Sequence, residues 1–256
     1  MNDFILYEYP INEITRLSLR LEHVFTQFDF HLEHPDYWHH QAALDSLIDL
    51  FNLLDRPDFK NKIAQQFLMY RDFLKNELKE NLEESKKELT ITRLAKTEEC
   101  IIYLEKSSGK LNQSLASIEF LMSLRSRFSK NNSVCNFDYP ILHFWLHQPS
   151  KQREQDLTEW LSLLADVRQV IFLLNTLTRH SGVFNTVYAE SGYLEIAFPA
   201  NINYQLVRVH IPCEILAYPE MSVGRQRMSL HLYSMSLTER PVQFKENVTF
   251  EITFCL

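Results

Sequence analysis

Histidines are the residue type with the clearest potential for chemistry, because four of them fall between positions 31 and 40: His31, His34, His39 and His40. Imidazole nitrogens are common ligands of zinc and related metals. None of these histidines belongs to an H-E-x-x-H motif or another tight ligand spacing, and no cysteine lies nearby. We therefore expect histidines at a surface or a helix boundary and no metal site.

The sequence contains no motif of the common catalytic sites. There is no G-x-S-x-G turn, and no serine or cysteine stands in an activating context. Only four glycines occur, and no two are close enough to form a phosphate-binding loop. We expect a protein that is not an enzyme and that uses no cofactor. A hydrolase or transferase with an unfamiliar site is the rival interpretation.

Two pairs of basic residues have spacings that place each pair on one face of a secondary-structure element. Arg16 and Arg20 share a helix face, and Arg227 and His231 share a strand face. Guanidinium groups bind carboxylates through two parallel hydrogen bonds, so a short acidic peptide is the natural ligand of such a site. Scattered surface arginines are the competing interpretation.

The segment FDYPILHFWLHQP, residues 137–149, is the densest aromatic stretch of the chain. Asp138 is a candidate N-cap and Pro140 suits the first turn of a helix, on which His143 and His147 share a face. In one interpretation this is a packed helix with Phe144 and Trp145 in the core. In the other, His143 also contributes to a polar surface.

The residues between 11 and 182 have the periodicity of a helical bundle. Asn12 can cap a first helix with apolar residues at steps of three and four: Ile14, Leu17, Leu21, Val24 and Phe28. Residues 75–108 carry many charges of both signs, which indicates a solvated helix pair. One long helix follows Ser150, and its wide apolar arc indicates the centre of the bundle or a dimer interface.

After Gly182 the periodicity changes to two. Apolar residues alternate with polar ones over 207–211, 227–232 and 248–254, as in half-buried antiparallel strands. The apolar run 4–9 near the N-terminus predicts a further strand that joins this sheet. We therefore expect an α+β fold, with an α-helical domain at 11–182 and a β domain made of 183–256 and strand 3–9. That strand would tether the first helix to the sheet, so that the two basic pairs approach each other.

Charge and hydropathy limit the partners and the compartment. The net charge of −7 and the pI near 5.8 disfavour nucleic acid as a partner. No apolar run approaches the length of a bilayer span, and the N-terminus has no basic region, so we expect neither export nor membrane insertion. The cysteines are scattered at Cys100, Cys135, Cys213 and Cys255, and we expect them to be reduced, buried thiols of a cytoplasmic protein.

Two blocks of the sequence, LYEYPINEITRLSLRLEHVFTQ and FDYPILHFWLH, resemble the signature stretches of the ZapD family, which are bacterial Z-ring-associated cell division proteins. The order of helices, second block, long helix and strands is similar as well. The resemblance implies a cytoplasmic homodimer at the division site, with an α-helical domain and a β domain. It also implies binding to the C-terminal tail of FtsZ, the tubulin-like division GTPase, and crosslinking of FtsZ filaments into bundles.

The resemblance also implies which residues bind the tail. The matching positions are Arg16, His143 and Arg227, while His231 stands where an arginine is expected. Arg225 lies just upstream of Arg227 and is a candidate to compensate. Further candidates are Arg20, Arg56 and Lys60. The alternative function is a nucleic-acid-binding or other peptide-binding adaptor that uses the same basic residues.

Overall fold

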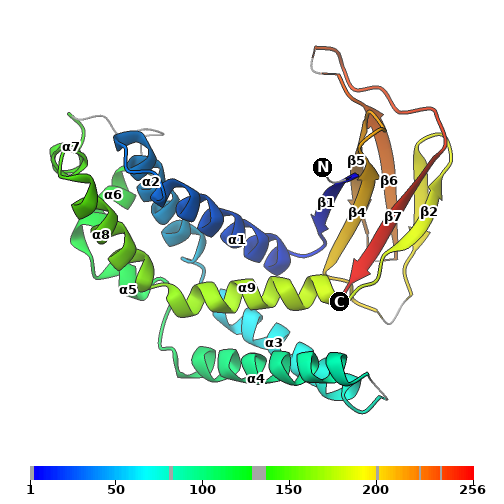
Figure 1. Cartoon of the computed structure of the whole chain (residues 1–256), viewed down its shortest axis with the longest axis horizontal. Helices are drawn as coiled ribbons and strands as arrows, with labels where there is room; N and C mark the ends of the chain where they lie inside the picture. Colours follow the sequence, from blue (N-terminus) through cyan, green and yellow to red (C-terminus); the bar gives the residue numbers. More distant parts are fainter. Residues whose placement is uncertain (1–2, 81–82, 129–136, 200–201, 225, 237) are drawn as a thin grey trace. The chain divides into compact units, whose positions relative to one another are not determined.

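The computed structural model describes residues 3–80, 83–128, 137–199, 202–224, 226–236 and 238–256. After one N-terminal strand the helices follow, and antiparallel sheets come last, which confirms the predicted α+β fold (Figure 1). Two compact units form: the β unit, Met1–Arg16 with Thr176–Leu256, and the helical unit, Leu17–Asn175. The division between them falls inside the first and the last helix.

The described helices follow the chain in the order α1 (Glu13–Leu32), α2 (Tyr37–Leu53), α3 (Phe59–Glu77), α4 (Glu84–Lys106), α5 (Gln113–Ala116), α6 (Glu119–Phe128), α7 (Pro140–Leu146), α8 (Ser150–Ser162) and α9 (Ala165–His180). The start of α1 confirms the predicted cap, because Asn12 Oδ1 accepts a hydrogen bond from the Thr15 backbone N–H at 2.9 Å. The apolar stripe that follows is buried as expected at Leu17, Leu21, Val24 and Phe28.

The charged segment 75–108 differs from the predicted helix pair, because it supplies one complete helix, α4, which pairs with the preceding helix α3. Helices α3 and α4 pack against each other, with Phe67 and Tyr70 of α3 and Leu104 of α4 among the buried residues. Lys75 and Glu98 form an ion pair between the two helices, at 3.1 Å. Most of the buried side chains between the two helices are apolar, whereas Lys75 and Glu98 are about half exposed, so burial stabilises the pair more than this ion pair does.

The prediction of one long helix after Ser150 is wrong. The chain bends by 65° between α8 and α9, and the Leu164 backbone N–H donates to the Leu161 carbonyl in a tight turn at the break. The apolar arc therefore belongs to two helices with separate buried faces. Leu157 is buried on α8 and Val170 on α9, whereas Leu163 at the bend is 43% exposed.

The strands of the β unit form two antiparallel sheets. Sheet A has the order β1-β4-β7-β2, made of β1 (Phe4–Pro10), β4 (Leu206–Pro212), β7 (Val248–Cys255) and β2 (Asn185–Ala189). Sheet B has the order β3-β6-β5, made of β3 (Tyr193–Ala197), β6 (Arg227–Ser234) and β5 (Ala217–Val223). The pairing of β1 with β4 confirms that the N-terminal strand joins the sheet.

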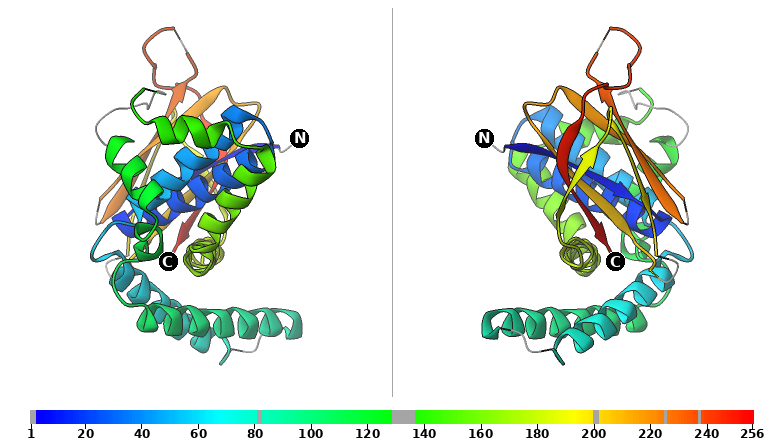
Figure 2. Two further views of the ribbon diagram at one scale, coloured as in Figure 1. Left: turned by 90° about the vertical axis from the view of Figure 1, so that its left-hand side faces the viewer. Right: turned by 90° about the vertical axis from the view of Figure 1, so that its right-hand side faces the viewer.

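The two sheets lie face to face and share one apolar core (Figure 2). Val209 and Phe250 contribute from sheet A, and Leu230 and Leu232 from sheet B. The alternation of buried and outward residues along each strand follows from this packing, because only one face of each sheet reaches the core. The outer face of each sheet carries its polar side chains.

A partly buried ion network ties β1 to the rest of the β unit. Glu8 on β1 accepts hydrogen bonds from Arg179 Nε and Nη2 and from Arg208 Nε, each at 2.9 Å. Burial alone would raise the pKa of Glu8, but the bonds and charges of the two arginines lower it below its ordinary value. The N-terminal strand is therefore held by paired charges as well as by its backbone ladder.

No disulfide joins the three described cysteines. Cys100 and Cys255 are buried, and burial raises the pKa of each to about 11, so neither is reactive near neutral pH. Cys213 is exposed, which differs from the expectation of buried thiols, and Cys135 lies outside the described residues. In the described part of the chain, we find no single helix with the length and hydropathy needed to cross a bilayer.

Candidate functional site

The outer face of β6 carries the two basic residues predicted from strand alternation. Met228, Leu230 and Leu232 are fully buried in the core of the β unit. The alternate positions, Arg227, Ser229, His231 and Tyr233, lie on the other face. Arg227 and His231 therefore share one solvent-facing surface.

Residues of the flanking strands complete this surface. Across the ladder with β3, Tyr193 pairs with His231 and Glu195 pairs with Ser229. Across the ladder with β5, Glu220 pairs with His231 and Tyr218 pairs with Tyr233. Directly paired residues point to the same side of a sheet. We call this surface the sheet B face; its residues are Tyr193, Glu195, Tyr218, Glu220, Arg227, Ser229, His231 and Tyr233.

Aromatic rings cover much of the sheet B face. The ring centroids of Tyr193 and His231 are 4.7 Å apart, and those of His231 and Tyr233 are 6.4 Å apart. Tyr233 also stacks on Tyr218, with 6.0 Å between centroids. Such a row of rings offers apolar contact together with hydroxyl groups for hydrogen bonding.

The charge of Arg227 is partly compensated on the same face. Its Nη1 donates to Glu195 Oε1 at 3.3 Å, while the Tyr193 hydroxyl donates to Glu195 Oε2 at 2.6 Å. The bond from Tyr193 and the charge of Arg227 lower the pKa of Glu195, and the same bond raises the pKa of Tyr193. The Arg227 side chain remains 72% exposed, so most of its five N–H donors face solvent.

The other basic candidates are divided between the two units. In the β unit, Arg16 of α1 forms an ion pair with Glu13, at 3.5 Å. In the helical unit, Arg20, Arg56 and His143 are exposed, and Lys60 Nζ donates to the Ser107 carbonyl at 2.6 Å. Arg225 lies outside the described residues. Arg227 and His231 are thus the candidates that one described surface brings together.

The aromatic segment around His143 only partly follows its packed interpretation. Helix α7 begins at Pro140 as predicted, but Tyr139 rather than Asp138 is its N-cap. Trp145 is buried and its indole N–H donates to Asp156 Oδ2 at 2.8 Å, whereas Phe144 is 66% exposed. A seven-residue helix covers the core along one narrow stripe, so Phe144 and His143 point to the outside.

A comparison with models of known protein families identifies the family of this chain. The family model described as ZapD, cell division protein, matches residues 19–231, which is most of the chain. The chain belongs to the ZapD family. The ZapD match includes His143, Arg227 and His231, while Arg16 lies just before its first residue.

In this ZapD-family chain the histidine cluster is a packed turn between α1 and α2. His31 Nδ1 and His39 Nδ1 are 2.9 Å apart, and the rings of His34 and His39 stack at 4.3 Å. Burial and the neighbouring imidazoles lower the pKa of His31. Among the described residues no three His, Cys, Asp or Glu side chains are placed to hold a metal ion. His40 lies in the first turn of α2, in agreement with the expected helix boundary, but it is buried rather than at the surface.

Reasoning from the sequence missed Glu195, Glu220 and the tyrosines of β3 and β5 as members of the same surface. The alternation of Tyr193 and Glu195 with apolar Leu194 and Ile196 is a weak strand signal over five residues. It would have identified an outward face. It could not have identified β6 as the neighbour, because the order of strands in a sheet depends on pairing between distant segments.

Proposed function

We propose that this ZapD-family chain binds the acidic C-terminal tail of FtsZ through the sheet B face and acts without catalysis. It works in the cytoplasm at the division site, as a homodimer that crosslinks FtsZ filaments into bundles. The observation that carries the proposal is the largely exposed guanidinium of Arg227 beside His231 on an aromatic strand face. Membership in a family of cell division proteins supports the same role.

A carboxylate of the tail accepts hydrogen bonds from the N–H groups of Arg227 that face solvent. Two parallel N–H···O bonds from one guanidinium fix the orientation of a carboxylate, which a lysine cannot do. Tyr193 and Tyr233 supply apolar contact for neighbouring side chains of the tail. Glu195 competes for the same guanidinium, so the single contact is weak.

Weak single contacts suit a protein that bundles filaments. Ordering a flexible tail consumes part of the contact free energy, and this limits the affinity of one site. A dimer that faces a filament with many tails gains from effective concentration instead, often by a factor of about 10² or more. Bundling is therefore expected to weaken with salt and to require dimerisation.

Reversing the charge of Arg227 is expected to abolish this binding. In Arg227→Glu a carboxylate stands beside Glu195 and repels the tail, so the affinity for a tail peptide falls at least about 10-fold. The measurement is fluorescence anisotropy of a labelled tail peptide, together with pelleting of FtsZ filaments. Arg16→Glu tests the candidate on α1 in the same assays.

Two further variants make the test specific. Lys96→Glu introduces the same charge change at an exposed position of α4 and is expected to pellet bundles as wild type does. Glu195→Gln removes the competing carboxylate and is expected to tighten tail binding about 2- to 5-fold. A folded Arg227→Glu variant that binds and bundles normally would refute the site; wild-type protein that never pellets bundles would refute the function.

The same tyrosines are suited to stacking on bases, which favours single-stranded nucleic acid as the second candidate. Two carboxylates on the face, Glu195 and Glu220, oppose a phosphate backbone. We expect no gel shift of single-stranded or duplex DNA at moderate salt. Robust binding there, without binding to the tail peptide, would select this rival instead.

A further inference from the structure

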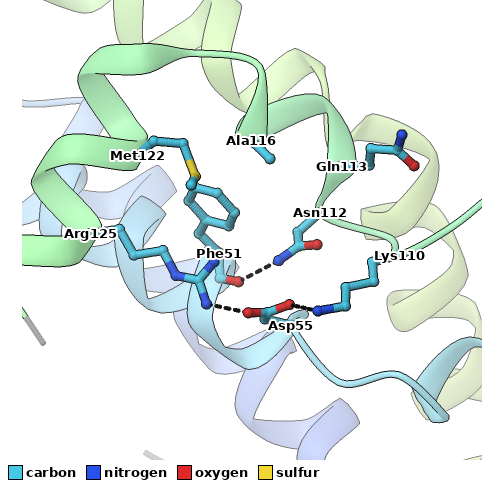
Figure 3. A pocket seen from close by; sticks show the side chains of 8 residues that line it. All are labelled: Phe51, Asp55, Lys110, Asn112, Gln113, Ala116, Met122 and Arg125. Carbon is cyan, nitrogen blue, oxygen red and sulfur yellow. Dashed lines mark hydrogen bonds and ion pairs between the residues drawn. The ribbon is translucent and has the colours of Figure 1, made fainter.

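A pocket of about 310 Å³ opens on the helical unit, between the C-terminal end of α2, the segment that follows α4, and helices α5 and α6 (Figure 3). Its wall combines apolar groups with a row of charges. The apolar part consists of Phe51, Ala116 and Met122, and the charged part consists of Asp55, Lys110 and Arg125. This volume is at the lower end of the range for small-molecule sites.

The charged row has an excess of positive charge. Asp55 lies between Lys110 Nζ and Arg125 Nη2, each 2.5 Å from a different carboxylate oxygen (Figure 3). Hydrogen bonds from Arg125 and Lys110 lower the pKa of Asp55 to about 2, so the carboxylate is charged at neutral pH. Two cations against one anion leave the row one positive charge that Asp55 does not neutralise.

The cation of Arg125 is held in place before any ligand arrives. Its Nε donates to Asn52 Oδ1 at 2.7 Å, and its guanidinium carbon lies 4.5 Å from the centroid of the Phe51 ring. Lys110 is 50% exposed and uses one of its three N–H donors on Asp55. Both side chains therefore keep N–H donors for a second carboxylate. The donors of Arg125 are fixed in position, whereas the Lys110 side chain is flexible.

The apolar wall is directly beside these donors. Asn112 Nδ2 donates to the Phe51 carbonyl at 3.0 Å and fixes the end of α2, while Met122 and Ala116 reach the pocket from the other helices (Figure 3). Methionine and phenylalanine together adapt to apolar groups of varied shape. A ligand that fills the pocket thus contacts an apolar surface and lies beside the two cations, Lys110 and Arg125.

We propose that this pocket binds an amphipathic carboxylate, in which an apolar group contacts Phe51 and Met122 and a nearby carboxylate accepts hydrogen bonds from Lys110 and Arg125. A free small acid and an apolar residue next to an acidic one in a peptide share this chemistry. The site uses no residue of the sheet B face, so it is independent of the tail-binding proposal.

The test follows the methyl group of Met122 by NMR in the full chain labelled at its methionine methyl groups, with Met122→Leu to assign the signal. N-acetylphenylalanine is expected to shift this signal saturably, with a Kd on the order of 1 mM. Its neutral amide, N-acetylphenylalaninamide, is expected to bind at least about 5-fold more weakly because it lacks the charge. A blocked peptide with an aspartate followed by a phenylalanine distinguishes a protein segment from a free acid as the source.

Three variants locate the binding. Ala116→Phe fills the pocket from an exposed position and is expected to abolish the shift. Lys110→Gln is expected to weaken binding at least about 3-fold, whereas Lys106→Gln, which loses the same charge at an exposed position four residues upstream, leaves it unchanged. The proposal would be overturned if neither N-acetylphenylalanine nor the blocked peptide shifted the Met122 signal, or if the shift were unchanged in Ala116→Phe.

Discussion

Replacing Arg153 by methionine is expected to lower the free energy of unfolding of the helical unit by about 3 to 5 kcal/mol. Arg153 is only 7% exposed, although it is charged and close to the start of α8. Methionine retains most of the apolar volume of the side chain, so the decrease in the free energy of unfolding reports the lost hydrogen bonds rather than a newly formed cavity.

The cost is large because Arg153 satisfies acceptors from three parts of the chain. Its Nη1 donates to the carbonyls of Leu146 and Gln148, and its Nη2 to the carbonyl of Pro35. Its Nε donates to His40 Nδ1 at 2.9 Å. Without the guanidinium these buried acceptors lose their partner, and the turn before α8 is no longer fastened to the connection between α1 and α2.

Tryptophan fluorescence during urea unfolding measures this loss, since Trp38, Trp145 and Trp160 all belong to the helical unit. Lys151→Met is the matched control, because Lys151 is exposed on the same helix and changes to the same residue. It is expected to change the stability by less than about 0.5 kcal/mol. A loss below about 1 kcal/mol in Arg153→Met would contradict the role assigned to the network.

The same network makes the stability depend on pH. Burial and the charge of Arg153 lower the pKa of His40 below its ordinary value. The unfolded chain therefore takes up a proton near pH 6.5 that folded His40 does not accept, and this contribution to stability is lost as the pH falls below that value. Its Nε2 has no hydrogen-bond partner in the described part of the chain, in keeping with a neutral ring.

Elements with a local signal could be predicted from the sequence. The cap of α1 at Asn12 and the outward position of Arg227 and His231 on β6 needed only a spacing of three, four or two residues. The joining of β1 to a distant sheet also followed, because an apolar strand near the N-terminus has no other partner to bury it. Each of these conclusions depends on which side of one element faces the core.

Features that depend on contacts between distant segments could not be predicted. The bend between α8 and α9 interrupts an unbroken helical pattern, and Arg153 is a charged residue in the core whose acceptor His40 lies 113 positions upstream. The neighbours of Arg227 on the sheet B face belong to β3, whose register with β6 is fixed only by folding. The same holds for the pocket beside Asp55, where Arg125 comes from a helix 70 positions downstream.

Replacing Asp45 by asparagine is expected to raise the free energy of unfolding by about 3 kcal/mol at pH 7. Asp45 lies on α2, and its Oδ1 is buried without a hydrogen-bond partner among the described residues. Burial, together with the charge of Asp49 one turn further along, raises the pKa of Asp45 to about 6. The folded protein therefore binds this proton more tightly than the unfolded chain does.

The direction of the pH dependence follows from this raised pKa. Below its ordinary pKa of 3.8 the carboxyl is protonated in both the folded and the unfolded chain, so its ionisation does not lower the free energy of unfolding. As the pH rises from about 4 to about 6, the unfolded chain releases the proton first, and the folded state loses stability until both states are ionised. The asparagine side chain carries no charge at any of these pH values, so the gain of Asp45→Asn is expected to be full above about pH 6 and to vanish near pH 4.

Urea unfolding at pH 4 and pH 7 tests this expectation, again by tryptophan fluorescence. Asp58→Asn makes the same chemical change at the exposed N-cap position of α3. Aspartate and asparagine are about equally favourable as N-cap residues, so this control is expected to have no effect at either pH. An equal gain at both pH values would assign the effect of Asp45→Asn to packing, and no gain at pH 7 would show that the carboxylate is hydrated. A gain confined to the higher pH identifies a buried negative charge that weakens the helical unit under neutral conditions.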